Sequence, residues 1–356
     1  MTWSMETHGG PLAALAAPWA GDLTPRPEAA ALRLPNHAVV SALFGAMMAA
    51  GPNAGDCGWR TAGQSVSNVQ RIGLSWLEVR LEAAHVDDAW LALRGVSPLC
   101  VDVLALLMSG PSEGGPAGVR LIRAADILEA KGYRRWGDER RGLERQLACE
   151  MLILRRLSAG LAGELLFKLS PLDAGGCDFV YEPGAWLNTL LQSAPPQFLD
   201  ARILRFDHRA NRGADVLAKK LAVHLTCSTA ARGSAVRTVR SLLQSAGVPR
   251  QDLASRRGRG GRLVDRFDEA VLRLQEHGLF QLRYRGRPST GAPADRVKGW
   301  VREWLDTEMA IRRLRPAEAP RAQVAAPMVP EAFMAPVHED LRRGVTRITA
   351  PRSEGG

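Results

Sequence analysis

Arginine side chains gather in the segment 250–298, in an order suited to binding phosphate. A run rich in glycine and arginine leads into an amphipathic helix pattern, and a short basic strand pattern follows. A guanidinium group presents several N–H donors in one plane, which suits phosphate oxygens and the edge of guanine. This order predicts a helix that enters a groove of nucleic acid, between a loop and a strand that hold phosphate. The arginines that we expect to contact DNA here are Arg256, Arg257, Arg259, Arg262, Arg266, Arg273, Arg283, Arg285 and Arg287.

The positive charge belongs to one part of the chain. Residues 202–298 contain 21 Lys and Arg against 8 Asp and Glu, a net charge of +13, whereas the whole chain of 356 residues carries +10. The remainder is therefore slightly acidic. A local positive field attracts phosphate backbones and makes their association depend on salt. The alternatives are a solvated basic face without a partner and attraction to anionic lipid.

Hydrophobic periodicity predicts the helix that must carry the central arginines. Its apolar residues recur at helical spacing and define one buried face: Leu263, Phe267, Ala270, Val271 and Leu274. Arg262, Arg266 and Arg273 form a line on the opposite face, which Glu269 and Glu276 share. One interpretation is a solvent-facing ladder of ion pairs with little energetic weight. The other is that the N-terminal arginines enter the major groove, and we expect Arg262 and Arg266 to contact bases.

Flanking patterns complete this basic unit. Upstream, a helix over 215–226 precedes a second helix that we expect Ser234 to cap. Downstream, residues 280–284 alternate between apolar and polar, so a strand there would pack one face and expose the other, basic one. A last helix carries Trp300 and Trp304 four residues apart, a pair more typical of a core than of a base-stacking platform.

The same order of elements is predicted a second time, upstream of the basic unit. An apolar helix, a short strand and a helix that stops at Gly132 precede a long amphipathic helix, which we expect Asp138 to cap. A hairpin over 165–181 follows, with its turn among proline and glycine residues. Arg141 and Arg145 would project from the long helix toward water or phosphate.

Short phrases in both copies resemble those of bacterial tandem winged-helix proteins of the plasmid replication initiator type. The resemblance covers about residues 75–305 and lies in the order of elements and in these phrases: Ile127–Tyr133, Asp207–Arg209, Leu217–Leu221 and Arg266–Ala270. It implies two related winged helices that bind repeated sites in double-stranded DNA at an origin, without a cofactor. It also implies a homodimer and contact with host replication proteins as further partners. The long Ala- and Gly-rich stretch before Leu74 and the proline-rich tail depart from this pattern.

Motifs that would indicate an enzyme are not found in the sequence. No lysine directly follows a glycine, which excludes a phosphate-binding loop of the GK[ST] type. The seven histidines form no close pair, which argues against nicking with two neighbouring histidine ligands and against helix-borne metallohydrolase motifs. Asp207 and His208 are adjacent but have no nucleophile near them in sequence. We therefore expect no catalytic residue, metal or cofactor.

Cysteine usage and hydropathy indicate a soluble protein of a reducing compartment. The five cysteines are scattered and odd in number, which is not typical of a disulfide scaffold or of a zinc site. The longest apolar run, 38–50, is too short to cross a bilayer, so a buried helix is expected instead. Because no basic leader with an apolar stretch and a cleavage site begins at Met1, we expect a cytoplasmic location and no membrane partner.

The predicted protein is α+β and mostly helical, with two winged-helix-like domains between disordered arms. Its divisions are 1–34 (disordered arm), 35–192 (first winged-helix-like domain with an N-terminal extension), 193–312 (second, basic winged-helix-like domain) and 313–356 (disordered Pro-rich tail). The predicted function is sequence-specific binding of double-stranded DNA, with initiation of plasmid replication as the favoured role. A winged-helix transcriptional regulator is the nearest alternative, and a DNA-processing enzyme is less favoured.

Overall fold

The chain forms an α+β structure in which helices contribute more residues than strands. The computed structural model describes residues 31–72, 75–109, 120–133, 137–159, 164–172, 176–228, 234–254, 259–285 and 300–314. The expected α+β class is confirmed, although four sheets make the chain less dominated by helices than the sequence implied. The arms predicted at the two ends lie outside the described residues, except for a few residues next to the folded part.

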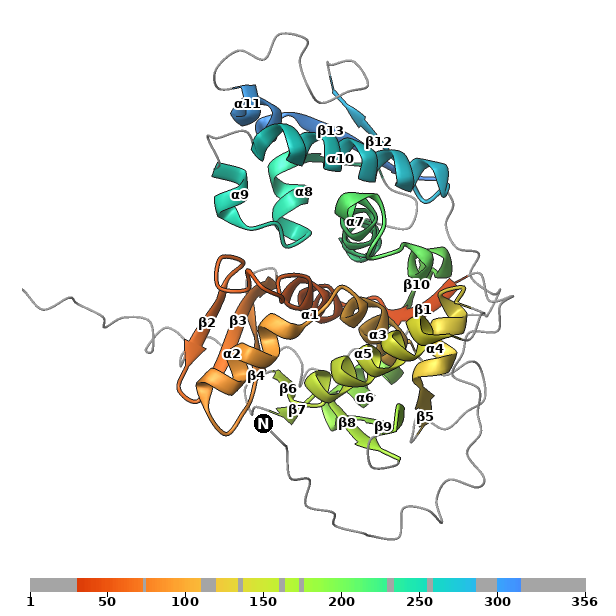
Figure 1. Ribbon diagram of the computed structural model, residues 1–356. Helices are drawn as coiled ribbons and strands as arrows, with labels where there is room; N and C mark the ends of the chain where they lie inside the picture. The colour runs from red at the N-terminus through yellow and green to blue at the C-terminus, as the bar shows by residue number, and fades with distance from the viewer. Residues whose placement is uncertain are drawn as a thin grey trace, which may run out of the picture.

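Eleven α-helices and two short 3-10 helices are present among the described residues (Figure 1). The α-helices are α1 (Ala38–Met48), α2 (Val86–Gly95), α3 (Leu99–Met108), α4 (Ala124–Ala130), α5 (Asp138–Leu154), α6 (Ala185–Ser193), α7 (Ala214–Ser228), α8 (Val239–Ser245), α9 (Arg250–Ala254), α10 (Arg259–Glu276) and α11 (Trp300–Asp306). The 3-10 helices are η2 (Ala201–Arg205) and η3 (Asn211–Gly213).

Four antiparallel sheets accompany these helices. Their strands are β1 (Ala31–Pro35), β2 (Trp59–Ala62), β3 (Ser65–Ile72), β4 (Ser75–Leu81), β5 (Arg120–Arg123), β6 (Leu157–Ala159), β7 (Glu164–Leu165), β8 (Phe167–Pro171), β9 (Asp178–Pro183), β10 (Pro196–Asp200), β11 (Ser234–Thr238), β12 (Phe280–Tyr284) and β13 (Glu308–Arg313). The strand orders are β2-β3-β4-β6-β7, β5-β9-β8, β11-β13-β12 and the pair β1-β10.

One arrangement of elements occurs twice along the chain. The first unit (99–183) runs α3-β5-α4-α5-β8-β9, and the second unit (214–313) runs α7-β11-α8-α10-β12-β13. In each unit the first strand pairs with the last one, which in turn pairs with the middle strand. The first unit also has β6 and β7 inserted, and the second has α9 and α11. The repetition expected from the sequence therefore extends to the order of strands within the sheets.

The amphipathic patterns pack as their spacing predicted. The apolar stripe of α5 is buried, and so is that of α10, which rests on α7 and β12. Phe267 of α10 meets the buried ring of Trp304 edge-on, with 5.7 Å between the ring centroids. The indole N–H of Trp304 donates to Tyr284 Oη at 2.9 Å, and Tyr284 donates to Asp268 Oδ1 at 2.7 Å. Trp304 is thus a core residue with its polar atom satisfied, as the interpretation of a packed Trp pair required.

The apolar run near the N-terminus forms the buried helix that the sequence predicted. Most side chains of α1 are buried, and its Ala46 carbonyl accepts a hydrogen bond from the buried Trp59 indole at 3.2 Å. Within the described residues, no single helix is long and apolar enough to cross a membrane. Helices α2 and α3 reach that length only together, but they meet at 96°, and every residue of α3 is buried.

Three local expectations differ from the structure. Ser234 does not cap a helix, because it begins strand β11, and the hydroxyl of Thr238 caps α8 by accepting from Ser241 N at 3.2 Å. Asp138 is the first residue of α5 rather than its cap, which is Gly137. Residues 31–34, predicted to belong to the disordered arm, form most of strand β1, which pairs with β10 and buries two leucine side chains. The position of the Thr238 hydroxyl moves the start of α8, a shift of one residue moves the cap of α5, and pairing with the distant strand β10 makes residues 31–35 a strand.

Glu150 on α5 is a buried acid whose burial has a measurable consequence. Its side chain accepts a hydrogen bond from the Ser97 amide at 2.8 Å through Oε1, whereas Oε2 has no hydrogen-bond partner among the described residues. Burial raises the pKa of Glu150 to about 7, with the hydrogen bond from Ser97 opposing the shift. An acid with a raised pKa in the folded state makes folding less favourable as pH rises through the interval between its unfolded and folded values.

We expect the Glu150→Gln variant to remove this penalty. Between pH 5 and pH 8, its melting temperature should rise relative to the unchanged protein by about 5 °C, because a neutral amide has no charge to bury. Thermal unfolding at both pH values, followed by circular dichroism, measures this difference. Parallel pH profiles of the two proteins would contradict the assignment.

Candidate nucleic-acid interface

The N-terminal half of α10 presents two exposed arginines, Arg262 and Arg266, one helical turn apart. Neither forms an ion pair with a carboxylate of the described residues, although the exposed Asp265 lies between them in sequence. The guanidinium of Arg266 passes beside Gly213, where an added Cβ would lie 3.8 Å from Nε. Both side chains point away from the buried face of α10, as their place in the periodic pattern predicted.

Arg273, in the C-terminal half of the same helix, has a different environment. It pairs with Glu269 at 3.0 Å and with Glu276 at 2.9 Å, both on α10, and its Nε lies 3.8 Å from Asp215 of α7. Only 31% of the Arg273 side chain is exposed. Three carboxylates therefore neutralise Arg273 in place. The line of charge on α10 divides into an unpaired basic half and an ion-paired half.

The strand arginines also differ from one another. Arg283 is exposed on β12. Arg285 follows β12 and pairs with Glu308 at 2.8 Å, with more than half of each side chain exposed. A solvent-exposed ion pair has little net stability, so a phosphate could replace the carboxylate at small cost.

Helix α5 of the first unit carries the upstream candidates. Arg141 and Arg145 are both exposed. Arg141 pairs with Asp138 at 2.7 Å, with both side chains largely exposed, and Arg145 Nε donates to the carbonyl oxygen of Arg141 at 3.4 Å. The neighbouring Arg140 is buried and donates to the carbonyl oxygen of Tyr133 at 3.0 Å, so it supports the fold and does not face solvent.

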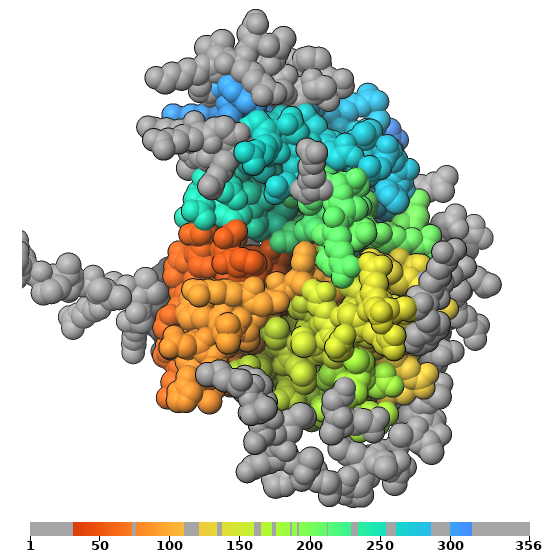
Figure 2. All heavy atoms as spheres, in the orientation of Figure 1, coloured from red at the N-terminus to blue at the C-terminus, as the bar shows by residue number. Residues whose placement is uncertain are grey.

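Several predicted contact residues cannot be placed. Arg256, Arg257 and Arg287 lie outside the described residues, and Arg259 begins α10 without a described side chain. The structure therefore leaves the glycine- and arginine-rich loop as a prediction. Figure 2 shows surfaces of α5 (yellow) and α10 (teal to cyan) on the same face of the molecule, with α7 (green) between them.

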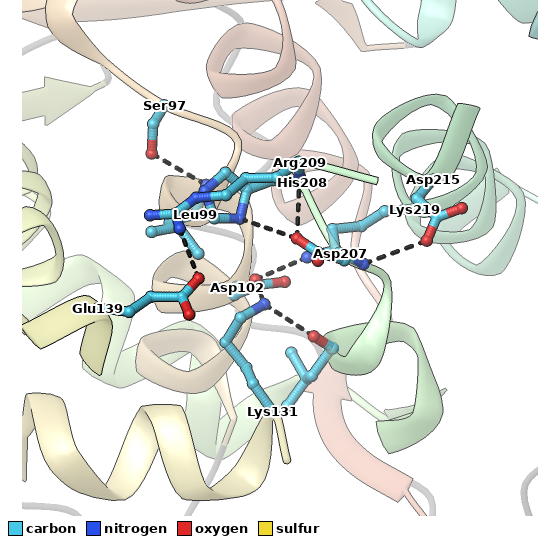
Figure 3. A network of polar contacts seen from close by, with 11 residues as sticks. Ser97, Leu99, Asp102, Lys131, Glu139, Asp207, His208, Arg209, Asp215 and Lys219 are labelled. Carbon is cyan, nitrogen blue, oxygen red and sulfur yellow. Dashed lines mark hydrogen bonds and ion pairs between the residues drawn. The ribbon is translucent and has the colours of Figure 1, made fainter. Parts of the chain in front are cut away.

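A buried polar cluster, which sequence reasoning missed, lies where the two units meet (Figure 3). We call Asp102, Lys131 and Lys219 the junction cluster. Asp102 of α3 accepts hydrogen bonds through Oδ2 from Lys131, at the end of α4, and from Lys219 of α7, the latter at 2.7 Å. Lys131 also donates to the carbonyl oxygen of Leu204 at 2.8 Å. The available signal was Asp102, a charge within a wholly apolar helix, since a buried charge requires a partner.

Burial sets the protonation equilibria around this cluster. It lowers the pKa of Lys219 to about 8, with Asp102 opposing the shift and Lys131 adding to it. The pKa of nearby His208 is also lowered, first by burial and then by Lys131. His208 Nδ1 lies 3.7 Å from Asp207 Oδ1, which is longer than a hydrogen bond. The adjacent Asp–His pair therefore lacks the hydrogen bond that would orient a general base.

Comparisons of the chain with protein-family models, with curated protein sequences and with solved structures found no match.

The division of charge along α10 predicts unequal effects on stability. Arg273→Ala should lower the melting temperature by about 3 °C, because it removes about 1 kcal/mol of pairing and leaves neighbouring carboxylates unscreened. Arg262→Ala, on the same helix, should change it by less than about 1 °C. Differential scanning calorimetry of the two variants tests the division. Equal losses would show that Arg262 has a structural partner.

Proposed function

We propose that both units are winged helices and that the protein binds double-stranded DNA through them. Each unit has the order helix, strand, helix, helix and two strands, with the first strand beside the last. In a winged helix, the third of these helices enters the major groove and the final strands border the wing. The corresponding helices are α5 and α10, and the corresponding strand pairs are β8-β9 and β12-β13.

The observation that carries the proposal is the charge distribution on α10. Arg262 and Arg266 are exposed without a carboxylate partner among the described residues, whereas Arg273 is held by carboxylates. The N-terminal end of a helix also carries the positive end of the helix dipole. DNA would therefore meet the N-terminal half of α10, and the acidic side chains of the other half would remain away from phosphate. Arg283 and Arg285 on the wing side would hold the backbone.

The biological role that we favour is initiation of replication, most simply at a plasmid origin. The duplication of the unit supports this role, because two readers in one chain can engage two sites on one DNA molecule. Selection of bound fragments from genomic and plasmid DNA of the source organism tests it. Enrichment of directly repeated sites near a replication gene is the expected result. Enrichment of promoter sites alone would instead favour a transcriptional regulator.

Removing the two unpaired arginines of α10 should weaken specific binding. We expect the Arg262→Ala/Arg266→Ala variant to lose about tenfold or more in affinity for a selected site, because each base contact contributes about 1–3 kcal/mol. Fluorescence anisotropy with the selected duplex measures the loss. The matched control is Arg80→Ala/Arg94→Ala, which removes the same charge from β4 and α2, where Arg80 pairs with Glu78 and Arg94 stacks on Trp90. Equal losses in both variants would remove α10 as the reader.

Salt dependence tests the contact with phosphate separately. The logarithm of the association constant should fall with the logarithm of salt concentration with a slope of about −4 to −8, as several phosphates release their counterions. Titrations of one duplex between low and physiological salt give this slope. A slope near zero would overturn DNA binding as the proposed function, whichever helix is involved.

A further inference from the structure

The junction cluster contains more positive than negative charge. Among the described residues, Asp102 is the one carboxylate within hydrogen-bond distance of the ammonium groups of Lys131 and Lys219. The exposed fraction of each of these three side chains is 2% or less, so solvent screens none of them appreciably. Asp207 and Asp215 lie near the cluster in Figure 3. Asp215 accepts hydrogen bonds from the backbone amide of Asp207 and the side-chain amide of Asn211 rather than from either lysine.

The two units contribute unequally to this cluster. Asp102 and Lys131 both belong to the first unit, and together they form a neutral pair. Lys219 is the group that the second unit inserts. A buried ammonium regains its lost hydration only through a counter-charge, and here the counter-charge is already shared. The lowered pKa of Lys219 has the same cause.

Further contacts join the second unit to the N-terminal part (31–98), which packs on the first unit through α1 and α3. Helix α1, which precedes the first unit, packs against α7, and Lys220 Nζ donates to the Met48 carbonyl oxygen. Cys57 Sγ donates to the Gly247 carbonyl oxygen at 3.3 Å, and Gln251 donates to Asp56 at 2.6 Å. These contacts hold the second unit against the rest of the protein, and the uncompensated charge of Lys219 opposes them.

We propose that the junction between the two units is a conformational switch, which Lys219 predisposes to open because Asp102 and Lys131 remain a complete ion pair without it. In the open form, Lys219 regains water while the first unit keeps its neutral pair. The distance in space between the two units can then change. This switch does not depend on the ligand that the protein binds.

A switch and a purely stabilising ion-pair cluster predict opposite effects of one substitution. Lys219→Met keeps most of the side-chain volume and removes the excess charge, so the junction should open less often. If the three charges merely held the units together, the same variant would open more often, because an ion pair across the junction would be lost. The sign of the change therefore decides between them.

The thiol of Cys57 reports opening, because it lies between the N-terminal part and the second unit and is half-buried against Gly247. Cys149 is exposed on α5 and provides an internal reference. The charges that act on the pKa of Cys57 are Lys220, Asp56 and Asp252, so a change at Lys219 alters its reactivity through exposure. The measurement is alkylation of the full chain by iodoacetamide, quantified for each cysteine by peptide mass spectrometry.

In Lys219→Met, we expect Cys57 to be alkylated at least about threefold more slowly than in the unchanged protein, relative to Cys149. Lys131→Met should also slow it, because Asp102 would then depend on Lys219 for its charge balance, and this second variant keeps the test decisive if the first does not fold. Asp102→Asn should accelerate it, since two buried cations would be left together.

Lys168→Met, which removes an exposed lysine paired with Glu182 on the β8-β9 hairpin, is the control and should change nothing. Faster or unchanged alkylation of Cys57 in Lys219→Met would overturn the switch.

Discussion

Helix α7 is the element on which the arrangement of the whole molecule depends. It packs against α10 of its own unit and against α1 of the N-terminal part, and ten of its fifteen residues are buried. Small side chains such as Ala218 and Ala222 let these neighbours approach closely. A helix that is surrounded in this way has little solvent face for its charged residues. Lys219 and Lys220 must therefore find oxygen partners inside the protein, and both find them across the junction.

Much of the fold could be predicted from the sequence, because the helices follow from hydrophobic patterns within single segments. The apolar stripes of α5 and α10 identified both long helices and their buried faces, since a period of 3.6 residues is visible in a single segment. Strand β11 was mistaken for the start of a helix, because five residues with Ser234 at their head carry a weak signal of either kind. What makes β11 a strand is its pairing with β13, more than sixty residues away.

The candidate site was predictable only in part, for a related reason. Periodicity places Arg262, Arg266 and Arg273 on one outer line, but it does not reveal which carboxylates surround each guanidinium. Asp215 reaches Arg273 from another helix, and that contact depends on the packing of α7 against α10. Asp102 likewise acquires its meaning from Lys131 and Lys219, which are distant in sequence. The exposure and the ion-pair partners of a side chain thus depend on the tertiary structure, whereas the helical face on which it lies depends on the segment alone.

The pairing of β1 with β10 has a consequence for how the chain folds during its synthesis. Residues 31–35 can pair only after residues 196–200 have been synthesised, so the ribosome must complete the whole first unit before β1 can pair with β10. Until then the buried side chains of Leu32 and Leu34 are left uncovered on that side. Sequence-distant pairing of this kind is slow to form. The second unit, by contrast, begins after β10, and all three strands of its sheet come from within it. The N-terminal part is therefore the segment of the nascent chain most exposed to premature association with other chains.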